Sequence, residues 1–239
     1  LSQSSDYHSV RITWSGRRWD APAQRRFLAI GLPIGLAILF EASLFCVAAL
    51  VLSPLGDVVV AAHQIALSVT SQLFMLPLSL AIAVTIRIGT AYGAQAWEQI
   101  RAIQRAGFTL ATLVSVITMT LLLFCRNWIP QAYTPDHAVQ QLAGQLLLFA
   151  AMYQVADAWQ VTAAGCLRGL QETRWPMWIT LICYWVVALP LGIYLAHHTV
   201  WGAQGLWMAL LTGLFMASGG LLWRLRHHTQ RLGLSSMPH

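Results

Sequence analysis

Apolar residues occur along this chain in six runs, separated by short segments in which polar and charged residues gather. The runs approach or exceed the roughly 20 residues that a helix needs to cross a lipid bilayer. None alternates strictly between apolar and polar positions, which favours helices over the strands of a membrane barrel. The predicted spans cover about residues 27–52, 58–86, 107–128, 139–166, 177–196 and 203–223. The pattern therefore predicts an all-α, polytopic membrane protein built as a bundle of six transmembrane helices.

The spans also define the expected domains. We expect a basic arm over residues 1–26, a six-helix transmembrane lobe over residues 27–226 and a tail over residues 227–239. Residues 90–105 combine apolar positions with Arg101 and Arg105, which is typical of a short amphipathic helix lying along the membrane surface. Because the first residue is leucine, we expect the chain to be part of a longer polypeptide.

The composition supports the prediction of a membrane protein, and the distribution of charge predicts how the helices are oriented across the membrane. Hydrophobic residues make up 57% of the chain and charged residues only 9%, against about a quarter in water-soluble domains. All 14 basic residues are arginines, and only Arg126 falls on the opposite side from the rest if the six spans alternate in direction. Since basic residues collect on the cytoplasmic side of a membrane, we expect both ends of the chain to be cytoplasmic and lipid to surround the bundle.

Several function classes are disfavoured by the sequence. The arginines punctuate the apolar runs and form no patch with interleaved aromatic residues, so we expect no nucleic-acid partner. The four cysteines form no CxxC pair, and the histidine pairs 197–198 and 227–228 cannot share one helix face. We find no metal-ligand spacing and no nucleophile–base arrangement, and we therefore expect neither an enzyme nor a bound cofactor.

Two acidic residues, Glu41 and Asp157, lie well inside predicted spans, whereas the other six fall in arms and loops. A carboxylate at the centre of a membrane helix costs roughly 3 kcal/mol even on lenient insertion scales. Counted along ideal helices from Arg26 and Arg168, the two carboxyls lie at similar depth. Every arginine is expected at a membrane boundary, so neither carboxyl has a basic partner within the membrane.

Polar residues surround Asp157 on its own helix. Tyr153 precedes it by four residues and Gln160 follows it by three, so all three share one helix face, which Gln154 flanks. Gln72 of the second span is a further possible supporting group. Carboxylates in this setting are protonated, bind a hard cation through oxygen, or face an organic cation. The alternative is that both are permanently protonated and hydrogen-bonded between helices.

Four stretches of the chain, taken together, resemble the multidrug and toxic compound extrusion (MATE) family, in particular its bacterial NorM-type members. They are Gly31–Phe45 (GLPIGLAILFEASLF), Val59–Gly89, Met152–Arg174 (MYQVADAWQVTAAGCLRGLQETR) and Tyr184–Ala196, within a resemblance from about Arg17 to Leu225. The family fold has twelve helices in two lobes, and the resemblance implies that this chain is the carboxy-terminal lobe. Its implied partner is the missing amino-terminal six-helix lobe.

The resemblance also implies an activity and a site. It implies an antiporter of the bacterial inner membrane that exports organic cations, such as dyes and antibiotics, in exchange for Na⁺ or H⁺. The family's cation site maps onto Glu41, Tyr153 and Asp157, and Glu41 and Asp157 would be the metal ligands if the coupling ion is Na⁺. Two alternatives remain open: an isolated fragment that transports nothing, and a six-helix permease or channel that works as a homodimer.

Overall fold

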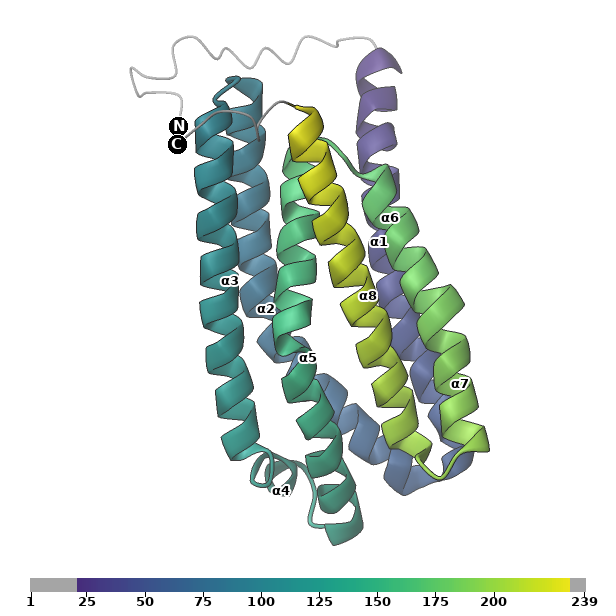
Figure 1. Ribbon diagram of the computed structural model, residues 1–239. Helices are drawn as coiled ribbons and strands as arrows, with labels where there is room; N and C mark the ends of the chain where they lie inside the picture. The colour runs from purple at the N-terminus through teal and green to yellow at the C-terminus, as the bar shows by residue number, and fades with distance from the viewer. Residues whose placement is uncertain (1–20, 233–239) are drawn as a thin grey trace, which may run out of the picture.

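The computed structural model describes residues 21–232, and its regular elements are all helices (Figure 1). The elements, in chain order, are α1 (Ala21–Leu52), the 3₁₀ turn η2 (Ser53–Leu55), α2 (Asp57–Gly93), α3 (Trp97–Cys125), α4 (Ile129–Tyr133), α5 (His137–Gly169), α6 (Arg174–Leu181), the π-helix η3 (Ile182–Ala188), α7 (Leu189–His198) and α8 (Gly202–Arg231). The expectation of an all-α membrane protein is confirmed. Most of the predicted amino-terminal arm and the last residues of the tail lie outside the described residues.

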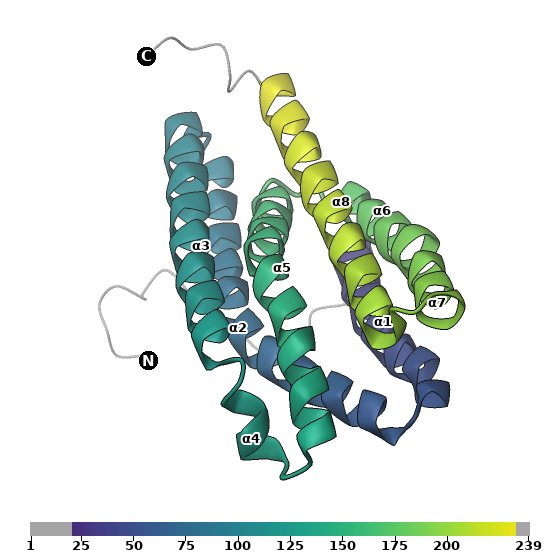
Figure 2. The same ribbon diagram turned by 60° about the horizontal axis from the view of Figure 1, so that its bottom comes forward.

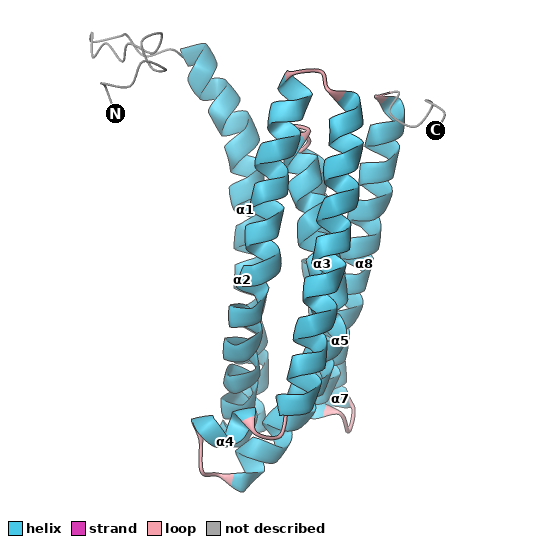
Figure 3. Cartoon of the chain, turned by 90° about the vertical axis from the view of Figure 1, so that its left-hand side faces the viewer, coloured by secondary structure: helices cyan, strands magenta, loops and turns pink. Residues whose placement is uncertain are grey.

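The long helices run side by side along one axis, with their connections at the two ends (Figure 3). Within residues 21–232, five segments are long and apolar enough to cross a membrane. These five segments are Ala21–Leu55, Asp57–Gly93, Trp97–Cys125, Arg174–His198 and Gly202–Arg231. The other long helix, α5, has 33 residues and packs against α2, α3 and α8. More than half of its residues are buried, so α5 forms the centre of the bundle.

The arginines gather at one end of the bundle. The first turns of α1, α3 and α6 and the last turns of α2, α5 and α8 lie together at the top of Figure 1. Arg126 follows α3 at the opposite end. The predicted surface helix over residues 90–105 is wrong, because α3 begins at Trp97 and continues without a break to Cys125. The polar first turns of α3 precede the apolar part of the same long helix.

Proline shapes two of the long segments. Pro77 lies near the middle of α2, which bends visibly along its length (Figure 2). A proline ring removes one amide donor and crowds the carbonyl four residues earlier, which kinks a helix. Pro190 occupies the start of α7, directly after the π-helix η3. In both cases an interruption in the backbone hydrogen bonds changes the direction or the winding of a helix inside the bundle.

Small residues allow α5 and α2 to approach closely. A Cβ atom added at Gly165 would lie 2.7 Å from the Ala81 carbonyl oxygen, and one at Gly169 would lie 2.8 Å from the Ile88 Cβ. The Thr85 hydroxyl bridges the two helices, since it donates to the Gly165 carbonyl at 2.9 Å. Close backbone approach between small residues is a principal source of helix association in membranes.

This contact predicts a strong packing effect. We expect Gly165→Val to lower the free energy of unfolding by about 1–3 kcal/mol, because the new side chain has to displace the α2 backbone. Gly219→Val is the matched control, since nothing lies within 4 Å of a Cβ at that position of α8. Thermal unfolding in detergent measures both variants. Equal melting temperatures for the two would contradict the close α2–α5 contact.

Candidate functional site

Helices α1 and α5 bring the two intramembrane carboxyls together. Glu41 of α1 and Asp157 of α5 interact electrostatically with each other. Asp157 is buried, with 6% of its surface exposed, and Glu41 is partly buried. The structure therefore places at one site the two acidic residues that depth counting had placed at one level of the membrane.

Tyr153 lies one turn before Asp157 on the same face of α5, as the spacing predicted. Its phenol pairs with the Thr70 hydroxyl of α2 and interacts electrostatically with both carboxyls. Its ring stacks on Trp207 of α8, with centroids 6.2 Å apart and planes 24° apart. Contacts with α2 and α8 thus fix the phenol beside Asp157.

The three glutamines of the predicted set have different surroundings. Gln160 is 4% exposed, and its Oε1 accepts a hydrogen bond of 2.6 Å from the Tyr184 hydroxyl. Gln154 is 2% exposed, and its Nε2 lacks a hydrogen-bond partner within the described residues. Gln72 is exposed on α2. It follows Thr70 by two residues, about 200° around the helix, so it does not share the face of α2 that carries Thr70.

Within the described residues neither carboxyl forms an ion pair with a basic side chain, as expected. Arg168, one residue before the end of α5, interacts electrostatically with Glu41. Its side chain is only partly exposed, and its Nε is buried without a hydrogen-bond partner. The charge of Arg168 thus acts on Glu41 from the end of α5, an effect between helices that counting along a single helix does not include.

Further residues at the site, Tyr184 and Trp207, were not among the predicted site residues because they lie on other helices. Tyr184 of η3 interacts electrostatically with Glu41 and Asp157. Behind Tyr153, the Trp207 indole donates a hydrogen bond of 3.1 Å to the His63 Nδ1, and His63 is fully buried. His63 and Tyr184 both fall in the stretches that carry the family resemblance, which was the available signal for them.

The donor set of the site is made of oxygen atoms. It combines two carboxyls, two phenols and the amide oxygen of Gln160, and contains no thiol or imidazole ligand. Within residues 21–232, no group of three or more His, Cys, Asp or Glu residues is placed to hold a metal ion. Oxygen donors suit hard cations such as Na⁺ and do not suit zinc, which prefers nitrogen and sulfur.

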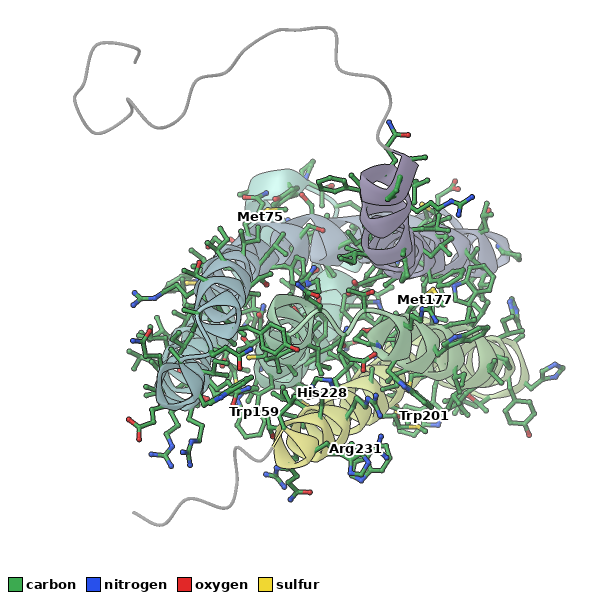
Figure 4. The ribbon with its side chains drawn as sticks, turned by 90° about the horizontal axis from the view of Figure 1, so that it is seen from above. Met75, Trp159, Met177, Trp201, His228 and Arg231 are labelled. Carbon is green, nitrogen blue, oxygen red and sulfur yellow. The ribbon has the colours of Figure 1, made fainter. Side chains whose placement is uncertain are left out.

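A second polar cluster ties the ends of the helices at the arginine-rich end. The Arg224 guanidinium donates to the Glu172 carboxylate at 2.8 Å and lies 4.7 Å from the centroid of the Trp175 ring. His228 Nε2 lies 3.7 Å from the same Glu172 oxygen. Figure 4, which looks onto this end, shows His228 and Arg231 on the last turns of α8. These contacts join the α5–α6 connection to α8.

The sequence and the fold both match known proteins. Residues 33–194 match the model of the MatE family. The chain is 53% identical over 236 residues to a probable multidrug resistance protein NorM of Acinetobacter baylyi, covering 99% of this chain and 53% of that protein. It is 41% identical to the multidrug resistance protein PmpM of Pseudomonas aeruginosa, covering 90% of this chain and 46% of the relative.

Solved structures show the same fold at low sequence identity. A MATE protein in the straight conformation superposes with a TM-score of 0.84 at 19% identity, over 94% of this chain and 50% of that one. The bent form of the Vibrio cholerae transporter VcmN gives a TM-score of 0.78 at 17% identity, over 95% and 50% of the respective chains. The chain thus spans about half the length of the curated relatives and structures that it matches.

Proposed function

The chain belongs to the MatE family of transporters, and we propose that it forms the carboxy-terminal half of a secondary active transporter that exports organic cations in exchange for Na⁺ or H⁺. The observation that carries this proposal is the pairing of Glu41 with Asp157 between α1 and α5. Two carboxyls that share one partly dry site attract positive charge of any kind. A metal ion, a proton or an organic cation each relieves their mutual repulsion.

Competition between these cations would provide the coupling. Occupancy of the carboxyl pair by a proton or Na⁺ removes the charge that attracts an organic cation, and a bound organic cation lowers the affinity for the ion in return. Such linkage is reciprocal by thermodynamic necessity, and a ligand shifts a conformational equilibrium only through its differential affinity for the two states. Glu41, Tyr153 and Asp157 are the proposed ion ligands.

The arginine distribution supports an orientation for the bundle. The described arginines other than Arg126 lie at one end, and basic residues collect on the cytoplasmic side of a membrane. We therefore place the ends of this segment in the cytoplasm and Arg126 on the outer side of a bacterial inner membrane. Relatives from Acinetobacter and Pseudomonas support the bacterial setting.

A second lobe is the proposed partner of this chain. Only 11% of the most apolar window of α1 is buried within the bundle, although α1 carries Glu41. The chain matches about half of its relatives' length, and inverted or parallel repeats that meet at a central binding site are common in secondary transporters. The amino-terminal half of the same transporter would cover part of α1 and complete the wall of the cavity for organic cations.

The proposal is tested by transport in vesicles. The native polypeptide that carries this sequence would be reconstituted with ethidium as the organic cation, and either a Na⁺ gradient at equal pH or a pH gradient without Na⁺ would be imposed. We expect one of the two gradients to move ethidium and an ionophore that dissipates this gradient to stop the movement. Ethidium movement that is independent of both gradients would contradict ion-coupled export.

A further inference from the structure

The π-helix η3 interrupts the segment between α6 and α7 over residues Ile182–Ala188. Wide turns of this kind are rare and occur frequently at functional sites. A local cause is present in the sequence, because Pro190 has no amide to bond the carbonyl of Val186 four residues earlier. The helix is therefore free to widen before the proline, and two neighbouring aromatic side chains, Tyr184 and Trp185, project from the widened turn.

Each of these aromatic residues holds one of the helices that carry a carboxyl. The Tyr184 hydroxyl donates to Gln160 Oε1 at 2.6 Å, on α5, one turn after Asp157. The Trp185 Nε1 donates to the carbonyl oxygen of Phe40 at 3.1 Å, on α1, directly before Glu41. Two consecutive residues of η3 thus link the helices that carry the carboxyls. Trp185 bonds the α1 backbone directly before Glu41, and Tyr184 bonds the Gln160 side chain of α5, one turn after Asp157.

Helix α8 supports the widened turn from behind. A Cβ atom added at Gly213 would lie 2.6 Å from the Ala188 Cβ and 3.0 Å from the Cys183 carbonyl oxygen. The absence of a side chain at Gly213 therefore lets α8 lie directly against both ends of the turn. Tyr184 is 3% exposed, because its turn packs against α8 and its hydroxyl bonds Gln160 of α5.

The hydrogen bond of Tyr184 determines what its oxygen offers to the site. Because the hydroxyl proton is donated to Gln160, the lone pairs of the phenol oxygen remain available as acceptors. The same group interacts electrostatically with both Glu41 and Asp157. An acceptor oxygen that is held one turn from Asp157 by Gln160 is a suitable ligand for a hard cation or for a protonated carboxyl.

We propose that η3 is a clamp that sets the separation of the Glu41 and Asp157 carboxyls, with Tyr184 as a further oxygen ligand of the coupling cation and Trp185 as a positioning residue that holds α1. The proposal rests on the proposed function, since it needs a cation between the two carboxyls. It adds η3 to a site whose predicted cation ligands, Glu41, Tyr153 and Asp157, lie on α1 and α5.

The test measures how much coupling cation is needed to release a bound organic cation. Ethidium bound to the purified native polypeptide would be titrated off with Na⁺ at pH 8 and, separately, with acid in the absence of Na⁺. For whichever cation releases ethidium, we expect Tyr184→Phe to require about ten-fold more of it, as expected for the loss of one polar contact to a charged group. With acid, this is a shift of about one pH unit to lower pH.

Matched controls separate ligation from packing. Tyr194→Phe removes a hydroxyl from an exposed tyrosine of α7, and Trp223→Phe changes an exposed tryptophan of α8. We expect both controls to release ethidium at the unmodified cation concentration. We expect Trp185→Phe to raise the required concentration about three- to ten-fold, because α1 loses its anchor beside Glu41. Melting temperatures recorded in parallel show whether each variant is folded.

The outcomes distinguish a failure of the η3 clamp from a failure of the proposed transport function. If Tyr184→Phe and Trp185→Phe only lower the melting temperature and release ethidium like the unmodified protein, the clamp is overturned and both residues are packing residues. If the unmodified protein responds to neither Na⁺ nor acid, or if Asp157→Asn still responds, the proposed function fails and the clamp fails with it. A response lost in Asp157→Asn and weakened in Tyr184→Phe supports both.

Discussion

Asp157→Asn is expected to abolish ion-driven export of organic cations while leaving the protein folded and inserted. The amide keeps the size and most of the hydrogen-bonding capacity of the carboxyl, but it cannot take up a proton or balance the charge of Na⁺. Asp157 is the more deeply buried of the two carboxyls, so little water is present to replace it as a ligand. Cells that produce the variant should fall to the drug tolerance of cells without the transporter.

The same helix offers a control with the same chemical change. Asp136 is the N-cap of α5, where its side chain accepts a hydrogen bond of 2.8 Å from the Ala138 amide. Asparagine caps helices about as well as aspartate, so Asp136→Asn should export at the unmodified rate. Drug tolerance and ethidium efflux measure both variants at matched membrane abundance. Full export by Asp157→Asn would remove Asp157 from the coupling site.

Glu41→Gln should reduce export as strongly as Asp157→Asn does, but it should have a different effect on the stability of the protein. The substitution removes the second charge of the pair, so the coupling ion loses half of its anionic partners. It also leaves Arg168 without the carboxylate with which it interacts. A partly buried cation that loses its counter-charge is destabilising, and we expect a loss of about 1–3 kcal/mol in the free energy of unfolding.

The contrast between the two carboxyls is itself measurable. Asp157→Asn relieves repulsion between like charges and should leave the melting temperature unchanged or raised. Glu41→Gln should lower it, whereas Glu98→Gln, at an exposed position near the start of α3, should not. Equal melting temperatures for Glu41→Gln and Asp157→Asn would show that the Glu41 carboxylate does not stabilise the charge of Arg168.

Local periodicity made much of this structure predictable. The lengths of the apolar runs gave the helices, and the spacing of Tyr153, Asp157 and Gln160 gave the polar face of α5, because both depend only on helical geometry within one segment. Counting depth along two helices predicted that Glu41 and Asp157 lie at one level of the membrane, and the family resemblance implied that they share one site. The surface helix over residues 90–105 was wrong because a polar first turn of a long helix has the same local composition as a separate interfacial helix.

The contacts between helices were not predictable in the same way. The electrostatic interaction of Arg168 with Glu41 depends on the direction of a flexible side chain and on the position of α1 relative to α5. The role of Tyr184 depends on a π-helix whose width no apolar pattern encodes. The interaction of Thr70 with Tyr153 depends on the rotation of α2, which the apolar pattern of that helix does not encode. Packing between helices decided each of these three cases.

The central position of α5 bears on how the protein is made. Among the long helices described, α5 is the one that does not meet the apolar criterion for a membrane span, yet it lies in the middle of the bundle. Polar side chains in a lipid environment are stabilised when neighbouring helices supply partners. Helices α2 and α3, which pack against α5, are both synthesised before it. We therefore expect α5 to enter the bilayer against helices already in place, so that its integration depends on them more than on lipid.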